Sequence, residues 1–253
     1  MKLSVSIISF NEEKNIARTL EAVKGLADEI IVVDSLSTDN TVALAESVGA
    51  KVFIEKWKGH IAQKNSALEK CSGEWILALD CDEVVTPELR ESIEKVIKGE
   101  SDFCGYAINR RTFYMGRLLR YSWQPDWKLR FVRKSAAPAW GGYDPHDVLH
   151  TGGRISKLSG DLIHYSYKNF ADHIQKTVKY AEISAKSYAE KEKKSGFWAL
   201  LLKPFLVFFK KLIAQRGILD GVPGVMAAFS GAVYVYIKYA FLWELNRNND
   251  KQQ

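Results

Sequence analysis

At 253 residues, the chain is long enough for one large domain, or for one domain with an appendage. Its composition, 47% hydrophobic and 26% charged with no internal repeat, is typical of a packed globular protein. The net charge of +6 favours an anionic partner such as a nucleotide, a phosphorylated glycan or a membrane surface. The three cysteines form no CxxC pair and no disulfide framework, which indicates reduced thiols in the cytosol.

The first hundred residues alternate between strand-like and helix-like patterns. Short apolar runs predict strands over 3–9, 29–34, 51–55 and 75–79. Helical spacing and start or stop signals predict helices over 11–24, 37–49, 60–70 and 86–98. In the last of these, Thr86 is the expected N-cap and Pro87 the first helical residue. This alternation predicts βαβ units and a mostly parallel sheet with helices on both faces. The first run is too short and too strand-like for a secretory signal peptide.

Polar clusters follow three of these strands at the point where each strand ends. They are Ser9-Phe10-Asn11-Glu12, Asp34 and Asp80-Cys81-Asp82. Ligands of such sheets bind outside the carboxyl ends of the strands, so we expect the three clusters to converge on one edge. This convergence is a stronger indication of a site than any one of the motifs.

The rest of the chain has a mixed pattern and then an apolar one. Strands are expected over 106–113, 129–133 and 162–165, and a long charged helix over 169–194. The segment 140–153 is rich in Gly, Asp and His and shows little periodicity. Residues 197–209 are almost wholly apolar but are broken by Lys203-Pro204, and 221–237 are uncharged but contain Pro223.

The acidic residues after the strands suit a nucleotide diphosphate and its metal. Asp80 and Asp82 can reach the ribose and a divalent ion respectively, because Mg²⁺ and Mn²⁺ favour oxygen ligands and keep positions open for phosphate. A solvated acidic turn is the alternative. Asp34 can accept from a base or a ribose hydroxyl, or it caps the next helix, a role for which Asp39 is better placed. The cluster from Ser9 to Glu12 can contact the nucleobase, with Asn11 as a helix cap in the alternative interpretation.

The motifs SVSIISFNEEKNI, EIIVVDSLSTDNT and GEWILALDCDEVV resemble the family 2 glycosyltransferases of the GT-A fold over residues 1–165. With KNSALEKCSGEWILALDCDE, GGYDPHDVLHTGG and LIHYSY, the whole chain resembles bacterial lipopolysaccharide core glucosyltransferases that act on an inner-core heptose. The resemblance implies a UDP-sugar donor such as UDP-glucose, a divalent metal (Mg or Mn) and inversion at the anomeric carbon. The implied fold is a Rossmann-like, mostly parallel α/β sheet flanked by helices, with a C-terminal helical extension.

The resemblance also assigns roles to single residues. Lys64, in the segment KNSALEK, is expected with the donor-binding residues, and Arg130 is a candidate contact with the diphosphate. An inverting transfer needs a general base. The pair His146-Asp147 matches a His-Glu pair of the family with Asp in place of Glu, so Asp147 is favoured as the base and Asp144 remains the alternative. His164 is expected either as a metal ligand or as a buried, hydrogen-bonded histidine.

The implied domains are a catalytic domain over 1–168 and a helical region over 169–253. Residues 1–100 would bind donor and metal, and 101–168 the acceptor, where Arg and aromatic side chains from Arg110 to Arg133 suit phosphates and sugar rings. Such a surface also suits single-stranded nucleic acid, which the diphosphate-type site disfavours.

The apolar C-terminal region is expected to lie in a membrane interface, and a helical cap or homodimer interface is the alternative. A true membrane span is disfavoured, because residues 221–237 are short for one and are broken by Pro223. The protein would then be cytoplasmic and peripheral on the inner face of the bacterial inner membrane. Rival functions are a transferase of the same fold acting on a polyprenyl phosphate or a capsule glycan, a nucleotidyltransferase, and a non-catalytic membrane-associated scaffold. The residues FNEEKN do not form the Gly- and Arg-rich phosphate loop of a nucleotidyltransferase.

Overall fold

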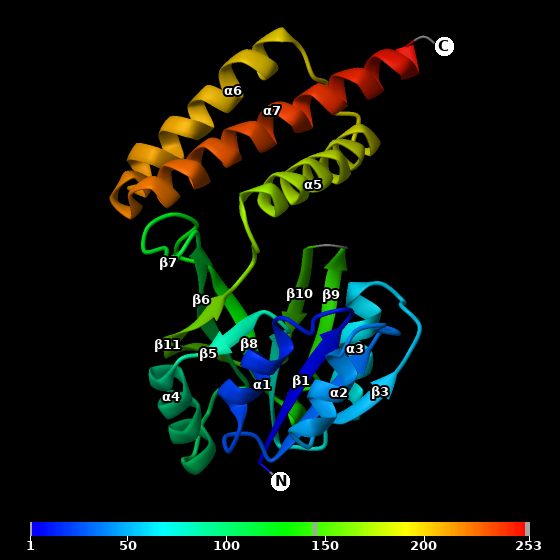
Figure 1. Cartoon of the computed structure of the whole chain (residues 1–253), viewed down its shortest axis with the longest axis vertical. Coiled ribbons are helices and arrows are strands. Elements are labelled where there is room, and N and C mark those ends of the chain that lie inside the picture. The colour runs from blue at the N-terminus through cyan, green and yellow to red at the C-terminus, as the bar shows by residue number, and fades with distance from the viewer. Residues whose placement is uncertain (1, 144–145, 251–253) are drawn as a thin grey trace. The chain divides into compact units, whose positions relative to one another are not determined.

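The computed structural model describes residues 2–143 and 146–250 (Figure 1). The chain forms two compact units. The first comprises Met1–Arg111 and Pro125–His164, and the second comprises Thr112–Gln124 and Tyr165–Gln253. The second unit therefore contains a short segment that interrupts the first unit in sequence.

The first unit is built on a mixed sheet, in which the first four strands of the chain are parallel to one another. The strands are β1 (Leu3–Ser9), β2 (Glu29–Asp34), β3 (Lys51–Ile54) and β4 (Trp75–Asp80), in the order β3-β2-β1-β4. All three pairings among them are parallel, as the alternating pattern predicts. The sheet continues beyond β4 with β8 (Trp127–Arg133), β6 (Gly105–Tyr114), β11 (Ile155–His164) and β5 (Glu83–Val85). β8 is antiparallel to β4 and to β6, and β11 is antiparallel to β5.

Helices cover both faces of this sheet. One face packs against α1 (Ile16–Val23), α2 (Thr41–Ser47) and α4 (Pro87–Lys98), which share a core with Leu3, Val5 and Ile7 of β1. The other face packs against α3 (His60–Lys70) and contributes side chains such as Ile31 and Ile76. Because successive strand residues point to opposite faces, strands buried on both sides read as continuous apolar runs.

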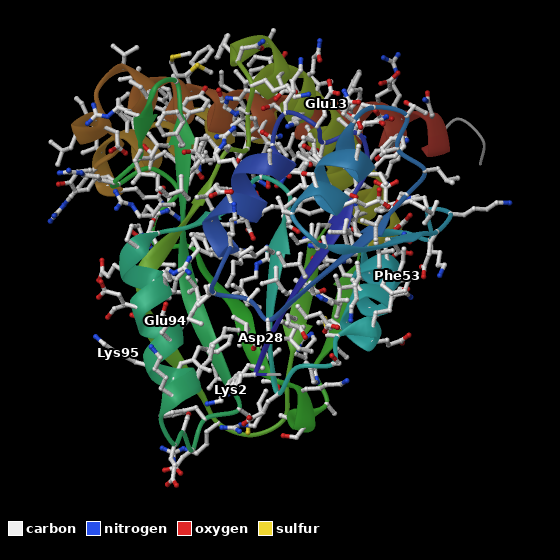
Figure 2. All side chains as sticks on the ribbon, turned by 60° about the horizontal axis from the view of Figure 1, so that its bottom comes forward. Lys2, Glu13, Asp28, Phe53, Glu94 and Lys95 are labelled. Carbon is white, nitrogen blue, oxygen red and sulfur yellow. The ribbon has the colours of Figure 1, made fainter. Side chains whose placement is uncertain are left out.

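Helix α4 shows how local sequence positions one of these helices. The Thr86 hydroxyl accepts the backbone N–H of Leu89 at 3.3 Å, and Pro87 occupies the first turn, which confirms the expected start. Leu89 and Ile93, four residues apart, are buried against the sheet. Glu94 and Lys95 point away from it (Figure 2).

Two helices of the first unit are shorter than predicted. The helix predicted over 11–24 begins only at Ile16, and the one predicted over 37–49 spans Thr41–Ser47. The residues before them are used in bonds between the two loops: the Asn11 backbone N–H donates to Ser37 Oγ at 2.8 Å, and the Thr38 N–H donates to Asn11 Oδ1 at 2.8 Å. Asn11 therefore fastens one loop to the other, with a φ of 53°, instead of capping a helix.

The segment 140–153, in which little periodicity was found, contains an antiparallel pair of strands. β9 (Ala139–Tyr143) pairs with β10 (His146–His150), with Trp140 opposite Leu149. Both of these side chains are buried in the core beneath α3. Main-chain pairing and two buried anchors are enough to form these strands, although the glycines weaken their sequence pattern.

The second unit is mainly helical. α5 (Phe170–Glu190) is capped by the Asn169 side chain, which accepts the Asp172 N–H at 2.9 Å, and it buries His173, Thr177, Ala181 and Ala185 at intervals of four. α6 (Phe197–Phe209) and α5 both pack against α7 (Val222–Asp250) (Figure 1). β7 (Arg117–Leu118) pairs with the end of β6 in the same unit.

The prolines of this unit do not interrupt its helices as the sequence suggested. α6 runs through Pro204, which removes one backbone hydrogen bond without ending the helix. Pro223 lies in the first turn of α7, where its missing N–H has no intrahelical partner to lose. The apolar segment predicted to be short for a membrane span therefore continues, and Val222–Asn248 is long and apolar enough to cross a membrane.

Candidate active site

The order of the parallel strands reverses between β1 and β4. The connections on the β1 side of the sheet use α1 and α2 on one face, whereas α3, which leads into β4, lies on the opposite face. Open α/β sheets bind ligands at such a reversal, outside the carboxyl ends of the strands. Ser9 is in register with Asp34 and Ile8 with Asp80, so the polar clusters that follow these strands are brought together as expected.

Asp34 is fully buried at this edge and is held within the protein. Its carboxylate accepts from Ser9 Oγ at 2.7 Å, from the Ser37 backbone N–H at 2.7 Å and from Ser37 Oγ at 2.6 Å. It joins the ends of β1 and β2 and is not the cap of α2. Asp39 is not the cap either, because the N-cap is Asn40 and makes no side-chain cap bond; the Asp39 carboxylate, one residue earlier, accepts the Thr41 N–H at 3.0 Å.

The loop after β1 leaves one large apolar side chain exposed beside these bonds. Phe10 is 56% exposed, and Leu36 in the neighbouring loop is 52% exposed with a φ of 65°. The Glu12 backbone N–H donates to Thr41 Oγ1 at 2.7 Å, and its carboxylate accepts from Asn15 Nδ2 at 2.8 Å. The loop is thus fixed by hydrogen bonds while the ring of Phe10 faces solvent.

A network of ion pairs joins three elements at the end of β4. Lys64 Nζ, from α3, lies 2.8 Å from Asp80 Oδ1 and 2.8 Å from Asp147 Oδ2 of β10. The guanidinium of Arg130, from β8, lies 2.7 Å from Asp80 Oδ2. The structure therefore brings Lys64, Asp80, Arg130 and Asp147 together, although they are spread over more than eighty positions of the sequence.

The charges of this network are mutually stabilised. Burial alone would raise the pKa of the Asp80 carboxyl, but the cations of Lys64 and Arg130 hold that pKa well below its usual range. Burial alone would lower the pKa of Arg130, and the carboxylates of Glu83 and Asp80 raise it instead. Arg130 is only 4% exposed, and its Nε has no partner among the described residues.

Sequence reasoning missed Glu83 and Trp140. Glu83 is fully buried; its carboxylate lies 3.0 Å from Arg130 and 3.4 Å from Arg110, and it accepts the Asp80 N–H at 3.1 Å. The ring of Trp140 lies 4.4 Å from Lys64 Nζ and 5.2 Å from the Arg130 guanidinium carbon. Glu83 directly follows the acidic pair and could have been included, whereas no sequence signal marks Trp140.

The two predicted metal ligands lie next to each other. His164 Nε2, at the end of β11, is 3.3 Å from Asp82 Oδ2, and both side chains are partly exposed. Among the described residues no group of three or more His, Cys, Asp or Glu is arranged to hold a metal. Adjacent ligands of an octahedral ion with bonds of about 2.1 Å lie about 3 Å apart, so the oxygen and nitrogen donors fit two positions of such an ion.

The alternative base cannot be compared with Asp147, because Asp144 lies outside the described residues. The Asp147 side chain is 14% exposed, beside Lys64.

Cys71 and Cys81 are buried free thiols, and burial raises the pKa of Cys71 to about 12. Neither thiol has the lowered pKa of a nucleophile.

The arginine-rich stretch proposed as an acceptor surface is divided between the two units. In the first, Arg110 pairs with Asp126 at 2.9 Å and Arg111 with Asp161 at 3.1 Å, and Lys157 lies over the exposed ring of Trp127. In the second, Arg117 donates to the Asp220 carbonyl at 2.9 Å. Arg117 is therefore engaged in holding the second unit together.

Comparison with known proteins agrees with this architecture. Residues 4–154 match the model of Glycosyl transferase family 2. The chain is 30% identical to the lipopolysaccharide core biosynthesis glycosyltransferase LpsC of Rhizobium meliloti, over 96% of this chain and 93% of LpsC. It is 29% identical to the uncharacterized glycosyltransferase RC0292 of Rickettsia conorii, over 100% of this chain and 92% of that protein.

A solved structure resembles the fold. The mannosyltransferase PcManGT of Pyrobaculum calidifontis, determined in complex with GDP-Man and Mn²⁺, superposes with a TM-score of 0.54 at 14% identity, covering 100% of this chain and 88% of that one. The fold has the GT-A-like arrangement of a partly parallel sheet between helices, as predicted. The chain belongs to glycosyl transferase family 2.

Proposed function

We propose that the protein is an inverting glycosyltransferase that moves a hexose, glucose from UDP-glucose, onto a heptose of the lipopolysaccharide inner core in the bacterial cytoplasm. The observation that carries the proposal is the meeting of Lys64, Asp80 and Asp147 next to the strand ends where a nucleotide would bind. Similarity to LpsC over nearly the whole chain supports the choice of acceptor.

Donor binding is assigned to the edge formed by β1, β2 and β4. The exposed ring of Phe10 would stack on a base, while the bonds among Ser9, Asp34 and Ser37 fix the shape of the loops. Asn11 and Glu12 complete that loop. Lys64 and Arg130 supply positive charge for the diphosphate, and Asp80 orients both cations.

A divalent metal would be held by Asp82 and His164, leaving its remaining positions for phosphate oxygens and water. When bound, the metal neutralises the charge that develops on the departing diphosphate. A carboxylate with an imidazole suits Mn²⁺ better than Mg²⁺, which is usually bound through oxygen alone.

Asp147 is the proposed base. Its carboxylate takes the proton of the acceptor hydroxyl as that oxygen forms a bond to the anomeric carbon, and the bond from that carbon to the UDP oxygen breaks with its electron pair. Lys64, in contact with Asp147 and Asp80, holds the carboxylate in a fixed position. Replacing one carboxylate at a time, in Asp147→Asn and Asp144→Asn, decides between the two candidate bases.

The test is a transfer assay on lipopolysaccharide from cells that lack the protein. The purified chain, UDP-glucose and Mn²⁺ should add one hexose to the inner core, as measured by mass spectrometry, and Asp82→Ala should abolish the addition. Glu94→Gln, on the solvent face of α4, is the matched control and should transfer normally. Transfer only to a polyprenyl phosphate or a capsule glycan would overturn the acceptor assignment, and failure to bind any UDP-sugar would favour a non-catalytic scaffold.

A further inference from the structure

The second unit exposes an apolar stripe along α6. Six side chains, at positions i, i+1, i+4, i+5, i+8 and i+9, are between 47% and 69% exposed: Phe197, Trp198, Leu201, Leu202, Phe205 and Leu206. We call this stripe the α6 ridge. The spacing places all six on one face of the helix. Contiguous apolar patches of this kind on a protein surface mark contact with another molecule or with a membrane.

The opposite face of α6 is already used. Leu200, Pro204 and Val207 are half-buried, and the helix packs against α7. A helix that is apolar on every side is normally covered on every side. Here only one side is covered by the unit to which α6 belongs, so the ridge is not the inward face of an ordinary core helix.

The charges around the ridge point to an anionic partner. Between Ser195 and Trp243 the only acidic residue is Asp220, whereas the cations are Lys203, Lys210, Lys211, Arg216 and Lys238. Asp220 is fully buried, and its carboxylate accepts the backbone N–H groups of Arg120, Tyr121 and Ser122 at 2.7–3.0 Å. The exposed cations of this segment are Lys203, Lys210 and Arg216, and the segment has no exposed acidic residue to offset them.

That distribution disfavours a second copy of the chain as the partner. A two-fold symmetric contact brings the same patch of both copies together, and this segment has no exposed carboxylate, so Lys210 and Arg216 of one copy would find no acidic partner on the same segment of the other. An anionic lipid surface instead attracts each of these exposed cations and accepts the apolar ridge.

The packing of α7 indicates that the unit lies on a bilayer and does not cross it. α7 is long and apolar enough to span, but the charged helix α5 packs along it. Tyr234 Oη lies 2.7 Å from Ser184 Oγ of α5, and Lys238 Nζ lies 4.3 Å from the centre of the Tyr188 ring. A span through α7 would carry Lys238 and its polar contacts into hydrocarbon or separate the two helices, and both are costly.

We propose that α6 lies flat in the headgroup region of an anionic bilayer, with the α6 ridge immersed, Lys210 and Arg216 on lipid phosphates, and α5 in water. This inference goes beyond the transfer reaction and depends on none of the residues assigned to it. A helix in this position is immersed by roughly 5–10 Å.

The test is co-sedimentation of the full chain with vesicles of phosphatidylcholine alone and of phosphatidylcholine with phosphatidylglycerol in equal parts. We expect at least about tenfold stronger binding to the anionic vesicles. The double variant Leu201→Gln with Phe205→Gln should weaken that binding at least about tenfold, and Lys210→Gln with Arg216→Gln should remove most of the preference for anionic lipid. The first control is Trp57→Gln, at an exposed aromatic residue of the first unit. The second is the double variant Lys179→Gln with Lys186→Gln on α5. Each control variant should bind vesicles as the unchanged protein does.

Three outcomes would overturn the proposal. They are equal binding by the ridge variant and the unchanged protein, absence of binding to anionic vesicles, and conversion of a dimer to a monomer by the ridge variant without any effect on vesicle binding. Resistance of the membrane-bound chain to extraction at high pH would instead identify a spanning helix. Binding of UDP-glucose by each variant is measured in parallel, so a failed donor site is distinguished from a failed membrane contact.

Discussion

In the first unit, buried positions hold ions, whereas in the second unit, exposed positions hold large apolar side chains. Glu83 and Arg130 are almost wholly inaccessible and charged, while Phe197 and Trp198 are more than 65% exposed. Both arrangements reverse the usual distribution, in which charges lie outside and aromatic rings inside. Burial of apolar surface alone would select neither arrangement, so each identifies a place where binding, and not folding alone, accounts for the residues present.

The largest expected effect is on catalysis in the first unit. Asp147→Asn should lower kcat by roughly 10²- to 10⁴-fold, because the amide cannot take the acceptor proton. The measurement is steady-state transfer to inner-core lipopolysaccharide with UDP-glucose. Asp144→Asn, assayed beside it, should retain activity. Loss of activity in Asp144→Asn with little change in Asp147→Asn would exchange the two roles.

The next effect tests whether the buried ions of the first unit depend on each other. Glu83→Ala should lower the free energy of unfolding by about 3–5 kcal/mol, because it leaves the charge of Arg130 buried with one partner fewer. Denaturant unfolding measures this change. Glu91→Ala, at an exposed position on α4, is the matched control and should change stability by less than about 0.5 kcal/mol. A similarly small change in Glu83→Ala would show that the buried ions are not coupled.

In the second unit, a buried histidine should make stability depend on pH. Burial lowers the pKa of His173 to about 4, and its Nδ1 lies 2.7 Å from the Tyr114 hydroxyl. Below pH 6.5 the unfolded chain binds a proton that the folded chain accepts only near pH 4. Stability should therefore fall as the pH drops through that window, by up to about 3 kcal/mol, and then level off.

The variant His173→Phe isolates this contribution. Its stability between pH 6.5 and 4 should depend on pH less than that of the unchanged protein, while His60→Gln, at an exposed position, should follow the unchanged curve. Parallel curves for His173→Phe and the unchanged protein would show that the histidine is protonated equally in both states.

The smallest effect sharpens the contrast between the two units. Leu201→Ser removes a large apolar side chain from the α6 ridge, yet it should change the free energy of unfolding by less than about 0.5 kcal/mol, because this side chain is 53% exposed. Leu77→Ser in β4, which is fully buried, should cost at least about 2 kcal/mol. A large cost at Leu201 in the absence of lipid would mean that the ridge contributes to folding.

The parallel half of the fold could be predicted because its signals are local. β2 and β4 contain continuous apolar runs, β1 alternates apolar residues with serines, and Thr86 with Pro87 marks the start of α4. The loops could not be predicted in the same way. Residues 11–15 and 35–40 bind one another across the ends of β1 and β2, and that pairing overrides their tendency to form helix. The pairing of β9 with β10 was missed because glycines conceal it.

Several residues of the candidate site could be named from the sequence, but the contacts between them could not. Asp80 and Asp82 stood out as a pair of acids after a strand, and family resemblance added Lys64 and His164. No local pattern shows that Lys64 contacts Asp80 and Asp147 at once. Glu83 was missed because a third acid in a turn is indistinguishable from a solvated one until Arg130, 47 residues away, is placed beside it.

The hydrogen bonds of Asp220 determine how this protein can be divided. The carboxylate holds three backbone N–H groups of the segment 112–124, which leaves the first unit and returns to it. The chain therefore passes between its units at three points, and a single cut after His164 would leave this segment without its acceptor. A truncated catalytic fragment would need residues 112–124 replaced by a short turn that joins Arg111 to Pro125. For the same reason, the helical unit could not have been joined to the first by simple fusion at one terminus.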